Sequence, residues 1–255
     1  MRDFARRLNV LFIIFFSTVF LMGCCNKALL LKKKQVLEYP SSEIPFKTSN
    51  YAFVEMEITH IDSIPTPKGI LVWTGSGSII KHKNKESYIL TAGHVCKVSI
   101  TEEMINFFGD KNLEEHSYEF DVTIHDFSKR KYKAEIHAIS KTRDLCLIKV
   151  SEKIGKPIKM SNKNPEIGEE LWTISSPLGI GVKNSAPILN GFYSGMDLNG
   201  DYMVTIPSAP GSSGSLAVNK KGEGVCVIYA VIVEFHHATL CEGRESVIEF
   251  LEQNL

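Results

Sequence analysis

The chain predicts an all-β fold, a barrel or a sandwich, and two features of its sequence carry this prediction. Short apolar or alternating runs recur along it, bounded by Gly, Pro, Asn and Lys. Roughly a dozen runs at such spacing are typical of antiparallel β proteins. Helical periodicity, by contrast, is scarce. The composition, with 44% hydrophobic and 23% charged residues, is ordinary for a globular protein with a sizeable core.

The predicted strands follow one another along most of the chain. Three runs alternate with period two, as half-buried strands do: YAFVEMEIT at 51–59, YEFDVTIH at 118–125 and KAEIHAI at 133–139. Others are apolar and rich in β-branched or aromatic residues, namely SYILTA, LCLIKV, ELWTIS, DYMVTI and GEGVCVIYAVIVEF. One helix is expected near 100–109. The clearest helix covers 244–255, where Val247, Phe250 and Leu251 have the spacing of one helix face.

Residues 1–24 have the features of a secretory signal. Three arginines precede an apolar run at 10–22, which is shorter than the roughly 18 residues needed to span a bilayer. LMGC at 21–24 resembles a bacterial lipobox, and this resemblance implies a lipid on Cys24. The alternative is a membrane anchor that is never cleaved. Either way we expect an exported protein of the periplasm or cell envelope, held at the membrane, with residues 25–47 as a linker.

Charge and cysteine spacing argue against a nucleic-acid partner and against a zinc site. The formal net charge is zero, so the bulk balance does not indicate nucleic acid. No CxxC pair exists, which excludes a zinc ribbon, and no metal site is expected. In an oxidising compartment the last four of the six cysteines could form two disulfides, in any of three pairings, or remain buried free thiols: Cys96, Cys146, Cys226 and Cys241.

Three residues are candidates for a catalytic triad. His94 follows YILTAG, where small residues let the backbone approach other groups closely. Asp144 begins the apolar run LCLIKV, either as a turn residue or as an acid that orients an imidazole. Ser213 lies in PGSSGSL, a kind of stretch that is most often an ordinary polar loop. The order His–Asp–Ser is that of chymotrypsin and differs from the orders of subtilisins and α/β-hydrolases.

Four blocks of the chain resemble, in order, those of trypsin-like serine peptidases with the chymotrypsin fold, and most of all the bacterial periplasmic heat-stress (HtrA-like) branch. The blocks are TGSGSIIKHKNKESYILTAGHVC, RKYKAEIHAISKTRDLCLIKV, IGEELWTISSPLGIGVKNSAPILNGFYSG and IPSAPGSSGSLAVNKKGEGVCVI. The resemblance implies one protease domain at 48–255 with two six-stranded antiparallel β-barrels, at about 48–155 and 165–243, and a C-terminal helix at 244–255. No PDZ domain is expected.

The resemblance also implies the roles of the candidate residues. Ser213 is the nucleophile, His94 the general base, and Asp144 the acid that orients the imidazole. The backbone N–H groups of Gly211 and Ser213 form the oxyanion hole. The chain departs from the family at Ser215, where glycine is usual. No metal or organic cofactor is expected.

The primary specificity pocket is implied in the same way. Pro207 takes the position at the base of the pocket, so no acid is there to attract Lys or Arg. Tyr229, Ala230 and Val231 form the wall, and Val231 stands where glycine would leave a deep slot. We therefore expect a shallow pocket that prefers small aliphatic side chains, with modest selectivity.

The function expected is that of a serine endopeptidase that hydrolyses protein or peptide substrates through an acyl-enzyme intermediate. The first alternative is a catalytically inactive lipoprotein that keeps the protease fold for binding. The second is an esterase that uses the same residues, and the third an exported adhesion lipoprotein whose resemblance is coincidental. Turnover of a protein substrate against that of a small ester distinguishes the two enzymes.

Overall fold

The computed structural model describes Pro45 and residues 47–66, 68–69, 71–97, 115–181, 183–232, 235 and 237–255. The predicted signal with Cys24, most of the predicted linker and the helix expected near 100–109 lie outside the described residues and stay predictions. No helix within the described ranges is long and apolar enough to cross a membrane.

The first half of the described chain forms a closed barrel. Its strands run in the order β2-β1-β3-β4-β7-β6-β5, and β1 also pairs with β5, so that six strands close the barrel and β2 extends β1 as a hairpin. Every pairing is antiparallel. The 3-10 helix η1 precedes β1, and η2 follows β4. The bounds are η1 Thr48–Asn50, β1 Tyr51–Ile61, β2 Ile64–Pro65, β3 Val72–Lys83, β4 Glu86–Ala92, η2 Gly93–Cys96, β5 Tyr118–Asp126, β6 Lys131–Ile139 and β7 Leu145–Val150.

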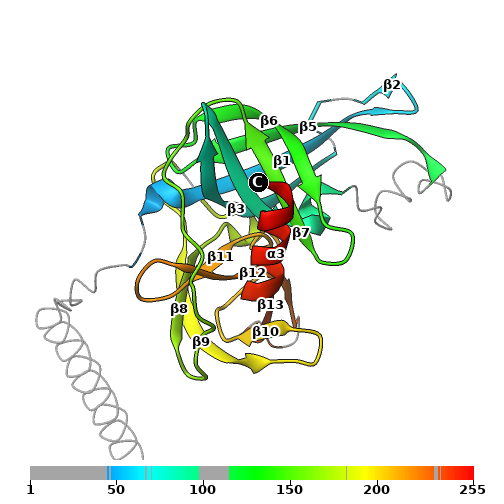
Figure 1. Cartoon of the computed structure of the whole chain (residues 1–255). Coiled ribbons are helices and arrows are strands. Elements are labelled where there is room, and N and C mark those ends of the chain that lie inside the picture. Colours follow the sequence, from blue (N-terminus) through cyan, green and yellow to red (C-terminus); the bar gives the residue numbers. More distant parts are fainter. Residues whose placement is uncertain are drawn as a thin grey trace, which may run out of the picture. The chain divides into compact units, whose positions relative to one another are not determined.

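The second half forms another closed barrel, with strand order β10-β13-β12-β11-β8-β9. The helix α3 follows its last strand. The bounds are β8 Glu170–Ile174, η4 Pro177–Gly179, β9 Ile188–Met196, β10 Asp201–Val204, β11 Leu216–Val218, β12 Gly224–Val231, β13 Thr239–Glu242 and α3 Arg244–Asn254. Figure 1 shows the two barrels with α3 beside them. The prediction of two six-stranded antiparallel barrels and a C-terminal helix is confirmed.

The alternating runs are strands with one face in a barrel core. In β1 the side chains of Val54, Met56 and Ile58 are buried, whereas Glu55 and Glu57 between them are partly exposed. This is the period of two that a strand imposes, because successive side chains point to opposite faces. Each barrel therefore encloses an apolar core of its own.

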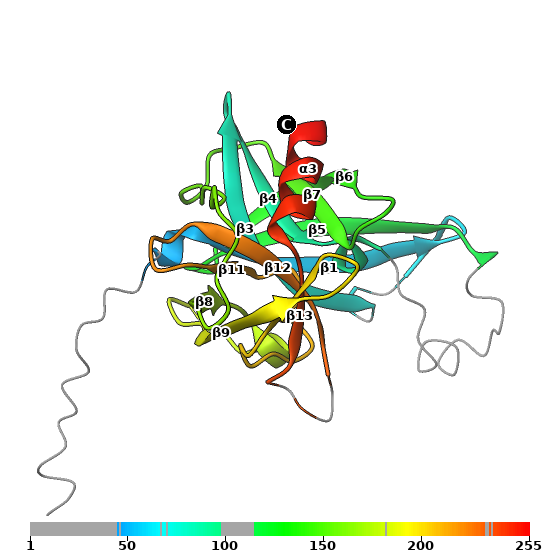
Figure 2. The same cartoon turned by 60° about the horizontal axis from the view of Figure 1, so that its bottom comes forward.

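A third apolar cluster lies between the barrels. Leu90 and Leu145 enter it from β4 and β7, and Leu216 and Val227 enter it from β11 and β12. Two buried residues of α3, Val247 and Phe250, belong to the same cluster. The C-terminal end of α3 reaches the first barrel, where the Asn254 carbonyl oxygen lies 3.1 Å from His137 Nε2. The helix thus packs against both barrels, as Figure 2 shows from a second direction.

Of the four cysteines considered for disulfides, two are bonded to each other and two are free. Cys96 in η2 is bonded to Cys146 in β7. Cys226 in β12 and Cys241 in β13 are buried free thiols. The pairing of β12 with β13 places Ile228, and not Cys226, opposite Cys241.

Replacement of both disulfide cysteines, Cys96→Ala with Cys146→Ala, should lower the free energy of unfolding. The bond joins residues 50 positions apart, and a closed loop of that length is worth about 4 kcal/mol. Denaturation with urea measures the difference. A reductant should weaken the parent towards the level of the double variant and leave that variant unchanged. Equal sensitivity of both proteins to reductant would contradict the prediction.

Candidate active site

His94 and Asp144 are brought together by two neighbouring strands. His94 lies in η2, directly after β4, and Asp144 directly precedes β7. These strands pair with Ala92 opposite Leu145, so the two residues stand at the same edge of the barrel. Asp144 Oδ2 lies 2.6 Å from His94 Nδ1, and Asp144 Oδ1 accepts the His94 backbone N–H at 2.6 Å. One carboxylate therefore holds both the ring and the backbone of the histidine.

This close approach depends on the glycine before the histidine. A Cβ atom on Gly93 would lie 2.8 Å from Asp144 Oδ1 and 2.9 Å from the Leu145 nitrogen. Real Cβ atoms essentially never come so near to other heavy atoms. The small residue in AGH is thus needed so that the carboxylate can reach the histidine.

The environment of Asp144 keeps its carboxyl group ionised. Burial by itself raises the pKa of Asp144, but the hydrogen bonds and charge of His94 outweigh it, and the pKa lies below its ordinary value of 3.8. A carboxyl group with a lowered pKa stabilises the fold above the pKa it has in the unfolded chain. That contribution is lost only as the pH falls through the pKa of the folded protein.

The disulfide supports the same pair of residues. Cys96 comes two residues after His94, and Cys146 comes two residues after Asp144. Both cysteines are buried in the core of the first barrel. The covalent bond therefore joins the helical turn that carries the histidine to the strand that follows the acid.

Ser213 is carried by the second barrel, in the loop of residues 205–215 between β10 and β11. This loop packs against the edge that carries His94. Gly214 has φ +89°, and a Cβ atom there would lie 2.9 Å from the Ala92 nitrogen at the end of β4. The Ser213 hydroxyl donates to the Tyr229 carbonyl oxygen at 3.5 Å. Within the described part of the chain this hydroxyl makes no hydrogen bond to His94. In serine peptidases the hydrogen bond between nucleophile and base often forms fully only when substrate binds.

The backbone of this loop is hydrogen-bonded at nearly every position. The carbonyl oxygens of residues 209–213 accept bonds from Ser212 N–H, Leu178 N–H, Ser76 Oγ, Ser215 N–H and Ser76 N–H, in that order. The N–H groups of residues 209, 212, 214 and 215 all donate. Those of Gly211 and Ser213 donate to no group in the described part of the chain. These two N–H groups are the ones predicted for the oxyanion hole.

Ser76 of β3 holds the loop from the first barrel. It is fully buried. Its N–H donates to the Ser213 carbonyl at 2.8 Å, and its hydroxyl donates to the Gly211 carbonyl at 2.8 Å. The same hydroxyl accepts the N–H of Ser176 at 3.0 Å. Ser76 thus holds the carbonyl groups of Gly211 and Ser213, the two loop residues whose N–H groups have no acceptor within the described ranges.

Leu178 holds the peptide group before Gly211. Its N–H donates to the Pro210 carbonyl at 2.6 Å. Because a trans peptide is planar, the Gly211 N–H then points away from Leu178. Leu178 itself has φ +53°, a conformation uncommon outside glycine and often found at functional sites. Gly211 has φ +93°, and a Cβ there would lie 2.5 Å from the Ser176 carbonyl oxygen.

Of the residues predicted for the pocket, Tyr229 contacts the Ser213 hydroxyl through its carbonyl oxygen. Tyr229, Ala230 and Val231 are the last three residues of β12, and all are partly buried. Val231 pairs with Thr239 of β13. The Thr239 hydroxyl donates to the Ile206 carbonyl at 2.7 Å, which brings Pro207, the next residue, to the same strands.

Two residues that hold the loop, Ser76 and Leu178, are absent from the sequence-based prediction. Ser76 stands between two glycines in TGSGS, and this was the available signal, because small residues on both sides permit close contact. Nothing in the sequence around Leu178 indicates its positive φ. In the described part of the chain, no group of three His, Cys, Asp or Glu side chains could hold a metal ion.

Comparison with known proteins gives a family and a fold. Residues 75–227, which include all three triad candidates, match the family of trypsin-like peptidase domains. The fold is similar to that of a serine endoprotease from Yersinia pestis, with 18% identity, a TM-score of 0.61 and coverage of 84% of this chain and 66% of that chain. It is also similar to a protease from M. tuberculosis in its active form, with 14% identity, a TM-score of 0.58 and coverage of 81% and 82%. No curated protein matches the sequence.

The Ser76→Ala variant should be less stable than the parent by about 2 kcal/mol, because it leaves the buried Ser176 N–H without a partner. Urea denaturation measures this. Ser215→Ala is the matched control, since the Ser215 hydroxyl is equally buried but has no hydrogen-bond partner among the described residues. An equal loss of stability in the two variants would show that the bonds of Ser76 do not matter.

Proposed function

The chain belongs to the family of trypsin-like peptidases, and we propose that it is a serine endopeptidase that cleaves protein substrates through Ser213, His94 and Asp144. One observation carries the proposal. In the loop around Ser213 the backbone N–H groups of Gly211 and Ser213 have no acceptor among the described residues, while those of residues 209, 212, 214 and 215 donate. Two such donors in the loop that carries Ser213 suit a reaction in which negative charge develops on a carbonyl oxygen.

In the proposed reaction, Ser213 Oγ attacks the carbonyl carbon of the scissile peptide bond. His94 Nε2 takes the hydroxyl proton and later gives it to the leaving amine. The bond from Nδ1 to Asp144 fixes the tautomer that makes this possible and stabilises the imidazolium cation. Water then enters, and as its oxygen attacks the acyl carbon His94 removes its proton. The ester bond to Ser213 breaks, His94 gives the proton back to Ser213 Oγ, and the acid product leaves.

The developing oxyanion is stabilised by the N–H groups of Gly211 and Ser213. Loss of one such donor typically costs about 100- to 1000-fold in rate. The value of the site therefore depends on how firmly the two peptide groups are held. The N–H groups of Leu178 and Ser215 donate to the Pro210 and Ser212 carbonyl oxygens, which belong to the two peptides that carry these donors, and so support this role. Ser76 holds the carbonyl group of the next peptide in each case.

A second candidate function is that of an inactive binding protein with the protease fold. The observation in its favour is the contact of the Ser213 hydroxyl with the Tyr229 carbonyl oxygen in place of His94. The unused N–H pair argues against it, because a scaffold kept for binding alone has no need of two free donors at this place. An esterase would use the same site, so only the substrates that are turned over, proteins or small esters, distinguish it from a peptidase.

The side chain preferred before the cleaved bond is proposed to be small and aliphatic, such as Val, Ala or Ile. Val231 is paired with Thr239, and its branched side chain would fill the space that a deeper pocket leaves open. Pro207 supplies no charge at the base. A pocket of this kind distinguishes side chains that differ by one methylene by only about 1–3 kcal/mol.

The Ser213→Ala variant tests the proposed nucleophile. With residues 1–24 removed, the parent should react with a fluorophosphonate probe and hydrolyse a protein substrate. Ser213→Ala should not be labelled, and its turnover should fall by about 10⁴-fold or more. Ser215→Ala is the matched control in the same loop and should still be labelled. A folded parent that the probe does not label would favour the binding protein, and turnover of small esters alone would favour the esterase.

The pocket is tested with a peptide library in which the residue before the cleaved bond varies. The parent should favour small aliphatic residues, and Val231→Gly should extend cleavage to larger ones because it removes the branched side chain from the wall. A profile of the parent dominated by Arg or Phe, or a profile unchanged in Val231→Gly, would refute the assignment of the pocket.

A further inference from the structure

Glu242, the last residue of β13, is a buried carboxylate that the proposed reaction does not use. The residue is only 4% exposed. Its Oε1 accepts the backbone N–H of Asp144 at 2.7 Å. Its Oε2 has no hydrogen bond among the described residues and lies 3.7 Å from Arg143 Nη1. Burial of a carboxylate is costly unless it is paired, so this placement calls for an explanation.

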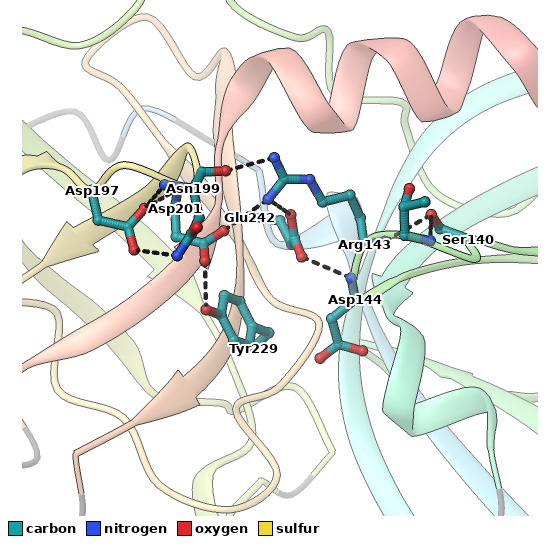
Figure 3. A network of polar contacts seen from close by, with 9 residues as sticks. Ser140, Arg143, Asp144, Asp197, Asn199, Asp201, Tyr229 and Glu242 are labelled. Atoms are coloured by element: carbon teal, nitrogen blue, oxygen red, sulfur yellow. Dashed lines mark hydrogen bonds and ion pairs between the residues drawn. The ribbon is translucent and has the colours of Figure 1, made fainter.

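The bond joins the second barrel to the residue that orients His94. Asp144 belongs to the first barrel, and Figure 3 shows its backbone nitrogen facing Glu242 while its carboxylate points away. The turn before it is fixed as well, because Ser140 N–H donates to the Leu145 carbonyl at 2.9 Å. With its N–H held by Glu242, the backbone of Asp144 cannot rotate without loss of that bond. The bond therefore restrains the backbone from which the carboxylate extends to His94.

Glu242 shares the cation of Arg143, the residue next to Asp144, with Asp201. Arg143 Nη1 lies 3.2 Å from Asp201 Oδ1, and its Nη2 donates to the Asn199 carbonyl at 2.7 Å. Asp201 Oδ2 in turn accepts the Tyr229 hydroxyl at 3.1 Å. Figure 3 shows the Arg143 side chain, which comes from the first barrel, directed at these acceptors of the second barrel. Two consecutive residues of the first barrel are therefore held by the second.

We propose that Glu242 is a positioning residue for the proposed triad, which it serves by holding the backbone N–H of Asp144. It touches neither substrate nor the reacting atoms, and the proposal rests on the proposed function. A bond from an amide to an ionised acceptor is roughly twice as strong as a neutral one. This explains why a carboxylate is suited to the position despite the cost of its burial.

The groups around Glu242 have opposing effects on its ionisation. Burial raises the pKa of Glu242 above its ordinary value, the Asp144 N–H and Arg143 lower it, and the carboxylates of Asp201 and Asp144 raise it again. The pairing with Arg143 therefore supports the charged form on which the strong hydrogen bond depends.

The test compares Glu242→Ala and Glu242→Gln with the parent, using the full chain labelled with ¹⁵N-histidine. The chemical shift of the His94 Nδ1 proton is followed by NMR, and its signal is assigned with His94→Gln. Loss of the bond should let Asp144 move, so the 2.6 Å hydrogen bond from Nδ1 weakens and the proton signal moves upfield. The move should be largest in Glu242→Ala and smaller in Glu242→Gln, whose amide oxygen still accepts the Asp144 N–H.

Steady-state kinetics should follow the same order. We expect kcat of Glu242→Ala to fall by about 10- to 100-fold, because small misplacements of catalytic groups have effects of this size. KM should stay within about twofold, since the substrate contacts are retained. Glu242→Gln should recover most of the loss.

Asp126→Ala provides the matched control. Asp126 ends β5 and also accepts a backbone N–H, from Arg130 at 3.0 Å, together with the Tyr132 hydroxyl at 2.9 Å. Its removal should lower stability without a change in the signal of the His94 Nδ1 proton. If Glu242→Ala does not fold, Glu242→Gln and Arg143→Gln are used in its place. Each weakens the charged acceptor and should move the His94 Nδ1 proton signal upfield.

An unchanged His94 Nδ1 proton signal in folded Glu242 variants would overturn the proposal, and so would an equal change in Asp126→Ala. The NMR measurement needs no turnover. If the signal follows the expected order in a protein without peptidase activity, Glu242 positions Asp144 and the proposed function fails. If the protein is active and the signal does not change, the proposed function stands and the role of Glu242 fails.

Discussion

The site depends on the packing of the two barrels, because His94 and Asp144 belong to the first and Ser213 to the second. An apolar cluster with residues from both barrels and α3 supplies the contact. Apolar packing has little direction of its own, and hydrogen bonds set the register. Ser76 of the first barrel holds the loop around Ser213, and Glu242 of the second holds Asp144. Each barrel thus contributes one buried residue that places a functional segment of the other.

Local patterns were enough to predict an all-β chain with a C-terminal helix and to single out His94, whereas the two barrels and the roles of the triad candidates were implied by the family resemblance. The alternation in YAFVEMEIT corresponds to β1, and RESVIEFLEQNL contains α3. His94 stood out because small residues precede it, and Gly93 is required for the contact with Asp144. Features of this kind are visible in sequence because their cause is local: the period of a strand, or a glycine where no Cβ fits.

Contacts between distant segments could not be predicted in this way. Ser76 and Gly211 are 135 residues apart, and Glu242 and Asp144 are 98 residues apart. The disulfide is a similar case, since spacing alone left three pairings open, and the pairing of β4 with β7 brings Cys96 and Cys146 together. Such contacts follow from the closure of the barrels and their packing, neither of which a short stretch of residues contains.

The most direct test of the account is a crystal structure of the protein treated with a peptide boronic acid that ends in valine. We expect boron bonded to Ser213 Oγ, one boronate oxygen within hydrogen-bond distance of the Gly211 and Ser213 N–H groups, and His94 still paired with Asp144. An adduct on another residue would contradict the account. So would an oxygen that faces away from those two N–H groups.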